Sequence, residues 1–63
     1  MGWDNMRTYG IDYVDSDGSV NFFIVDAESL DEAKDKARRV LIESYGLTKR
    51  NILNIEYLDW LDK

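Results

Sequence analysis

The first part of the chain alternates between polar and apolar residues, which is the period of a β-strand. Residues 7–14 carry an apolar side chain at about every second position, and residues 20–27 are dominated by β-branched and aromatic side chains. Between them, the Asp17-Gly18 step suits a tight turn, because glycine adopts a positive φ without steric cost. The pattern predicts two antiparallel strands, at about residues 7–14 and 20–27, joined as a hairpin.

The period then changes to that of an α-helix, with apolar residues three or four positions apart over residues 30–45. Ser29 followed by Glu32 matches a capping box, and Gly46 stands where glycine commonly ends a helix. The sequence therefore predicts a helix at about residues 30–45. After it, an apolar and β-branched segment at about residues 51–58 predicts a third strand.

These elements give a ββαβ order and the α+β class, in a single small domain that spans residues 1–63. The third strand has two candidate neighbours. Beside the first strand it runs antiparallel and gives the order 2-1-3, whereas beside the second it forms a parallel pair through a right-handed crossover. We expect a three-stranded, mainly antiparallel sheet of order 2-1-3, with the helix packed on one face, because antiparallel pairs outnumber parallel ones.

One helix can cover only one face of a three-stranded sheet. The alternation assigns three apolar residues of each strand to the covered face: Tyr9, Ile11, Tyr13, Phe23, Val25, Ala27, Leu53, Ile55 and Tyr57. A second apolar set remains for the opposite face: Val20, Phe22, Ile24, Ile52 and Leu58. Trp3 and Trp60, near the two ends of the chain, add to this surplus.

An apolar sheet face of this extent in a small protein is typically a contact site. We expect it to bind a protein partner or a second copy of the chain, because a core of 63 residues without disulfides needs reinforcement. The edge of the 20–27 strand offers a second route to a homodimer, in which two such strands pair to form a six-stranded sheet. The alternative is that the terminal segments fold across the face and bury it within one chain.

Charge divides the chain into two halves. Eight Lys and Arg against 13 Asp and Glu give a net charge of −5. Residues 1–32 hold eight acids and one base, a net of −7, and residues 33–63 hold five acids and seven bases, a net of +2. The hairpin is the strongly acidic part, and four of its carboxylates join the expected partner-binding set: Asp12, Asp15, Asp17 and Asp26.

The residues required for most independent chemistry are missing. The chain contains neither His nor Cys, so it has no imidazole or thiolate ligand for zinc and no histidine to activate a serine. Gly10, Gly18 and Gly46 stand apart and form no phosphate-binding loop. Asp15 and Asp17 suit a turn better than a calcium loop, because the residues that follow are largely apolar. We therefore expect no enzymatic activity, no cofactor and no metal.

A basic helix and loop raise the alternative of direct nucleic-acid binding. Six bases occur between residues 34 and 50, yet they scatter around the helix instead of forming a stripe. The acidic total also opposes contact with a phosphate backbone, so we expect this function less than protein binding. The acidic hairpin suggests the reverse arrangement, in which its carboxylates imitate nucleic acid on the basic surface of a protein.

In size, charge and lack of catalytic residues, the chain is similar to the small acidic proteins that phages and mobile elements encode to block host enzymes. No motif carries this resemblance, so it transfers no residue role. We expect a cytoplasmic, non-catalytic inhibitor or adaptor that binds a host protein through the apolar sheet face, Trp60 and the acidic hairpin. No apolar run approaches the roughly 20 residues of a membrane span. The other alternative is an accessory subunit of a larger enzyme complex.

Overall fold

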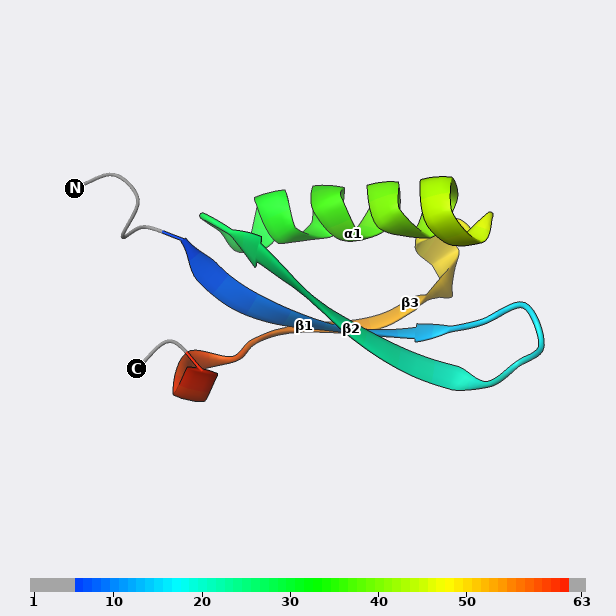
Figure 1. Ribbon diagram of the computed structural model, residues 1–63, viewed down its shortest axis with the longest axis horizontal. Coiled ribbons are helices and arrows are strands. Elements are labelled where there is room, and N and C mark those ends of the chain that lie inside the picture. The colour runs from blue at the N-terminus through cyan, green and yellow to red at the C-terminus, as the bar shows by residue number, and fades with distance from the viewer. Residues whose placement is uncertain (1–5, 62–63) are drawn as a thin grey trace.

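A computed structural model describes residues 6–61 and shows three antiparallel strands in the order β2-β1-β3, with one helix on one face of the sheet (Figure 1). The main elements are β1 (Arg7–Val14), β2 (Val20–Ala27), α1 (Leu30–Tyr45) and β3 (Ile52–Tyr57), and two short 3-10 helices flank β3, η2 (Lys49–Asn51) and η3 (Asp59–Leu61). The predicted α+β class, ββαβ order and 2-1-3 sheet are confirmed. The third strand is one residue shorter at each end than the sequence predicts.

The turn between β1 and β2 is held by its own polar groups. Gly18 has a φ of 87°, which any side chain would oppose, and its N–H donates to the carbonyl of Asp15 over 3.0 Å. The Asp17 carboxylate accepts the Ser19 N–H at 3.0 Å and the Ser19 hydroxyl at 2.6 Å. The turn that the Asp17-Gly18 step predicts is therefore confirmed.

Both ends of α1 are capped. The Ser29 hydroxyl oxygen accepts the N–H of Glu32 at 3.2 Å, and the Glu32 carboxylate accepts the N–H of Glu28. At the other end Gly46 adopts the left-handed conformation, with a φ of 68°, and its N–H donates to the carbonyl of Leu41. These contacts satisfy backbone groups that a helix leaves unpaired, and the predicted bounds of the helix are confirmed.

The core lies between α1 and the sheet. Ile11 and Leu41 are its fully buried large side chains, and Ala33 and Ala37 let the helix approach the strands closely. At the C-terminal end of α1, the ring of Tyr13 lies 5.6 Å from that of Tyr45, measured between centroids. Burial raises the pKa of the Tyr13 hydroxyl, and the neighbouring Tyr45 raises it further.

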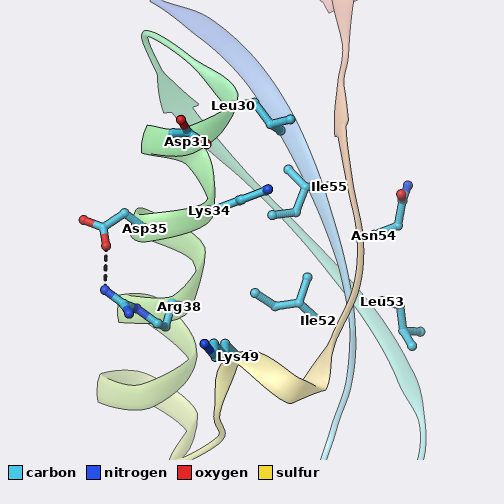
Figure 2. Close-up of a pocket in the computed structure, with 10 residues that line it drawn as sticks. All are labelled: Leu30, Asp31, Lys34, Asp35, Arg38, Lys49, Ile52, Leu53, Asn54 and Ile55. Atoms are coloured by element: carbon cyan, nitrogen blue, oxygen red, sulfur yellow. Dashed lines mark hydrogen bonds and ion pairs between the residues drawn. The ribbon is translucent and has the colours of Figure 1, made fainter.

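A β-bulge in β3 changes which of its side chains enter the core. Asp12 pairs with Asn54 but Tyr13 pairs with Ile52, so Leu53 is an extra residue on β3. The predicted faces of these two neighbours are therefore wrong: Ile52 packs in the core, whereas Leu53 is 56% exposed. Figure 2 shows Ile52 pointing toward α1, and Leu53 and Asn54 pointing away. Among residues 6–61 no helix is long and apolar enough to cross a membrane.

Candidate functional site

Within residues 6–61, no second layer covers the face of the sheet opposite α1, and we call it the open face. It is formed by residues of all three strands and the residue after β3: Gly10, Asp12, Val20, Phe22, Ile24, Asp26, Leu53, Asn54, Glu56 and Leu58. Val20, Phe22 and Ile24 are 64%, 58% and 52% exposed. These three residues of β2 lie where the sequence predicts them, and together they form an apolar stripe on the open face.

A glycine in β1 lets two open-face side chains meet. A Cβ atom placed on Gly10 would lie 2.8 Å from Cε1 of Phe22 and 3.1 Å from Cδ1 of Leu58, so both side chains occupy the space above this residue. Aromatic cover of a strand glycine is a known way to pin strand register. Leu58 is thereby buried, with 7% of its surface exposed, so it supports Phe22 from within the open face and offers little surface to a partner.

The segment after β3 turns along the open side of the sheet. The N–H of Leu58 donates to the carbonyl of Thr8 at 2.8 Å, and η3 follows on the side away from α1 (Figure 1). Trp60 is 67% exposed there. Within the described residues, η3 leaves the β2 stripe uncovered. Trp3, the other tryptophan that the sequence assigns to this surplus, lies outside the described residues.

Carboxylates border the apolar stripe. Asp12 pairs across the sheet with Phe22 on one side and Asn54 on the other, and Glu56 pairs with Gly10. Asp26, at the end of β2 away from the turn, accepts the Thr8 hydroxyl at 3.3 Å. Asp59 lies in η3, on the side away from α1, and Asp15 and Asp17 lie in the turn at one end of the sheet (Figure 1). The structure thus adds Glu56 and Asp59 to the four hairpin acids that the sequence singled out.

The acids of the turn have roles of their own. The hydroxyl and the N–H of Ser19 both donate to the Asp17 carboxylate, and these hydrogen bonds lower the pKa of Asp17 below its ordinary value of 3.8. Asp15 accepts the N–H of Ser16 at 2.7 Å. Asp17 therefore stays charged at neutral pH while it stabilises the turn.

The bases lie on the other side of the molecule. Within residues 6–61 they belong to the start of β1, to α1 and to η2: Arg7, Lys34, Lys36, Arg38, Arg39, Lys49 and Arg50. Arg7 stacks over the ring of Tyr57, 5.8 Å from its centroid, and Tyr57 pairs with the core residue Tyr9. The open face, the turn and η3 therefore carry six acids and no base among the described residues.

The bases of α1 are partly engaged within the helix. Arg38 and Arg39 both bind the carboxylate of Asp35, at 2.7 Å and 3.2 Å. Pairs at this spacing are typical of a solvent-exposed helix and leave less free positive charge for a phosphate backbone. The described structure offers no continuous basic stripe that would favour nucleic-acid binding.

A groove of about 520 Å³ separates α1 from β3 and forms a second candidate site (Figure 2). Its apolar lining comes from Leu30, Ile52 and Ile55, and its charged lining comes from Asp31, Lys34, Asp35, Arg38 and Lys49. No sequence pattern indicates this groove, because its apolar residues belong to the same periodic pattern as the core. The groove results from the position of α1 over the sheet. No local sequence pattern predicts that position.

The side chains of the described residues limit what either site can hold. Within residues 6–61, no three Asp or Glu side chains come close enough together to bind a metal ion. Comparison with protein-family models, with curated proteins and with solved structures finds no significant match to this chain. The open face and the groove are therefore the two candidate sites of the described structure.

Proposed function

We propose that this protein is a non-catalytic binding module whose open face binds another protein, one that presents an apolar centre surrounded by Lys and Arg. One observation carries the proposal: the exposed apolar stripe of β2 shares its face with Asp12, Asp26 and Glu56 and with no base among the described residues. Exposed apolar patches bordered by polar residues commonly mark protein contact sites.

The charge of the open face favours a basic partner over a second copy of the chain. Two open faces placed against each other would bring Asp12, Asp26 and Glu56 of one copy close to the same three acids of the other. Like charges across an interface oppose association, whereas a basic partner is steered toward an acidic surface. Electrostatic attraction sets the rate and orientation of encounter, and burial of the apolar stripe then holds the complex together.

The proposal extends to an inhibitor or adaptor that acts on a host protein in the cytoplasm. A surface of carboxylates without bases resembles the charge pattern of a nucleic-acid backbone, so a nucleic-acid-processing protein has the basic site that this face requires. The similarity in size and charge to acidic inhibitors of phages and mobile elements supports the same class of partner.

The test compares two isoleucines of equal exposure on opposite sides of the molecule, one in β2 and one in α1. Ile24 on the open face is 52% exposed and Ile42 on α1 is 51% exposed, so Ile24→Asp and Ile42→Asp change charge, size and exposure alike. Tagged wild-type protein is used to capture a partner from a cell lysate, and the purified partner is then titrated with each variant. We expect Ile24→Asp to weaken binding at least tenfold, because it would bury an unpaired carboxylate, and Ile42→Asp to change it less than twofold.

Salt and the acids give the second part of the test. Binding should weaken as salt rises, and the Asp12→Asn and Glu56→Gln variants should weaken it at low salt. Equal loss of binding with Ile24→Asp and Ile42→Asp would overturn the assignment of the open face. Capture of nucleic acid that survives Ile24→Asp but is lost with Arg38→Ala and Lys49→Ala would support the nucleic-acid alternative instead.

A further inference from the structure

The groove between α1 and β3 has the size of a small-molecule site, and the proposed function does not use it. Its volume of about 520 Å³ lies within the range of pockets that hold small molecules, roughly 300–1,000 Å³. Such pockets are lined mainly by apolar side chains, with a few polar groups that orient the ligand. The groove has both features, because Leu30, Ile52 and Ile55 lie beside charged side chains of α1 and η2.

The apolar part of the groove is accessible from outside. Leu30, in the first turn of α1, is 44% exposed. Ile52 and Ile55 of β3 are only partly buried, although both pack against the core. Figure 2 shows these two isoleucines pointing toward α1, across the groove. A ligand with an apolar body would remove these surfaces from water, and that burial favours binding.

Lys34 adds a positive charge beside this apolar surface. Its side chain points from α1 into the groove, toward Ile55 (Figure 2). Lys49 of η2 is a second lysine of the lining. Within residues 6–61, neither ammonium group forms an ion pair with a carboxylate. An ammonium group that has no carboxylate partner and lies against an apolar surface attracts an anion.

Two acids also line the groove, but they do not cancel this charge. The carboxylate of Asp35 points away from the groove, where it binds the guanidinium of Arg38 at 2.7 Å (Figure 2). Asp31 then remains against Lys34 and Lys49, so one acid and two bases leave a net charge of +1. The whole chain carries −5. The groove is therefore a positively charged site on an acidic protein.

We propose that the groove binds a small organic anion, with its apolar body against Leu30, Ile52 and Ile55 and its anionic group near Lys34. The volume of the groove sets the size of the ligand, and the lysines select the charge of its head group. The site lies on the α1 side of the sheet, and the open face lies on the other side. Anion binding therefore does not depend on the function proposed for the open face.

The first test uses three probes that share one alkyl chain and differ in the charge of the head group: octanoate, octanol and octylammonium. Each probe is titrated into isotope-labelled protein at low salt, below the concentration at which it forms micelles. Amide shifts in NMR spectra then report both the site and the affinity. We expect octanoate to shift the amides of Lys34, Ile52 and Ile55. It should bind about threefold more tightly than octanol, as expected for an exposed charge pair, and octylammonium should bind the groove least.

Variants of the groove charges provide the second test. Lys34→Gln should weaken octanoate binding about threefold, because it removes the ammonium group that attracts the carboxylate. Asp31→Asn should strengthen octanoate binding, because it removes the acid that opposes the anion. Neither change should alter the binding of octanol. Lys36→Gln is the matched control, because Lys36 lies on the β2 side of the same helix, where its ammonium donates to the carbonyl of Asp26, and this change should leave octanoate binding unaltered.

Three results would overturn the anion site. They are the absence of saturable octanoate binding, equal affinity for the three probes, and equal weakening of octanoate binding by Lys34→Gln and Lys36→Gln.

Ile24→Asp separates this site from the open face. This variant should bind octanoate as the wild type does, and loss of octanoate binding would assign the probe to the open face and overturn the anion site. A protein that binds octanoate but no partner protein would refute only the function proposed for the open face. A protein that binds a partner protein but not octanoate would refute only the anion site.

Discussion

The two faces of β2 have nearly the same amino-acid composition, but the side chains of one face are partly buried and those of the other are exposed. Phe23 and Val25 point toward α1 and are partly buried, while Phe22 and Ile24, their neighbours in the chain, are 58% and 52% exposed. Strand propensity cannot explain this contrast, because both sets are aromatic or β-branched. The difference is whether a second layer covers the face, and within the described residues α1 covers one face only.

The charges sharpen the contrast between the faces. On the helix side acids and bases alternate and pair, as Asp35 does with Arg38 and Arg39. On the open side, Asp12 and Glu56 lie beside the apolar stripe with no ion pair to a described base, while Lys36 of α1 reaches only the backbone of Asp26. A surface that keeps both apolar side chains and unbalanced charge suits association with a complementary surface better than a passive solvent face.

The largest expected effect is a loss of stability, and it is measured by changing one isoleucine on each face of the sheet. Ile11 is fully buried and Ile24 is 52% exposed, although both lie in the hairpin strands. We expect Ile11→Ala to lower the free energy of unfolding by about 2–5 kcal/mol, because it leaves a cavity in the core. Ile24→Ala should cost less than about 1 kcal/mol, because its side chain packs on one side only.

Urea denaturation followed by circular dichroism measures both losses. The free energy of unfolding of a natural domain is only about 5–15 kcal/mol. In so small a protein, the Ile11→Ala substitution therefore risks unfolding the chain completely. The milder Ile11→Val, with an expected loss of about 0.5–1.5 kcal/mol, then gives a measurable value. Similar losses at the two positions would show that the open face is buried in solution and that the contrast between the faces does not hold.

An intermediate effect tests the packing of Phe22 and Leu58 over Gly10 on the open face. Gly10→Val would place a branched side chain where the ring of Phe22 and the end of Leu58 now lie, 2.8 Å and 3.1 Å from the first added atom. We expect a loss of about 1–3 kcal/mol, because overpacking forces both side chains to move. In a variant that also carries Phe22→Ala, the space is free and the loss at Gly10 should shrink.

A double-mutant cycle measures this coupling. An interaction energy of about 1 kcal/mol between Gly10→Val and Phe22→Ala would confirm that the ring lies over the glycine in solution. Additive losses would mean that Phe22 already points away from the sheet. In that case the apolar stripe would be more exposed than it is here, and Leu58 would lose its cover.

Much of the fold could be predicted because its signals are local. The Asp17-Gly18 turn, the capping of α1 by Ser29 and its end at Gly46 each depend on a few neighbouring residues, and all three are confirmed. The 2-1-3 order followed from general preferences for antiparallel pairing. The exposed side chains of β2 also lie where alternation places them.

The bulge in β3 could not be predicted from local sequence patterns. Nothing in the sequence around Leu53 marks an extra residue, because the bulge arises from how β3 aligns with β1. Its effect is a one-residue slip that exchanges the faces of Ile52 and Leu53. The burial of Leu58 and the groove beside β3 are likewise results of packing between distant segments.

The charge pattern was predicted along the chain but not in space. By sequence the acidic half ends at residue 32 and the second half is mildly basic. Folding adds two acids of that second half, Glu56 and Asp59, to the hairpin acids, because β3 lies beside β1. The division that matters for a partner is therefore between two faces, and it is sharper than the division between two halves.

The smallest expected effect separates the acids that shape the turn from those that are free to meet a partner. The hydrogen bonds from Ser19 lower the pKa of Asp17 below 3.8, so the folded state takes up this proton less readily than the unfolded chain. The resulting stabilisation is complete above the ordinary pKa and is lost as pH falls through the lowered one. Asp17→Asn removes this titration, so the free energy of unfolding should fall less steeply below pH 3.8 than in the wild type. At neutral pH, Asp17→Asn should leave partner binding unchanged, whereas Asp12→Asn should weaken it.

Ser19→Ala is the matched control for this effect. It removes the hydroxyl donor at 2.6 Å and keeps the N–H donor at 3.0 Å, so the acid limb of the stability curve should lie between those of the wild type and Asp17→Asn. Unfolding measured by circular dichroism across this pH range checks all three proteins. Identical acid limbs would show that the turn does not hold the Asp17 carboxylate, and this acid would then join those of the open face in binding a basic partner.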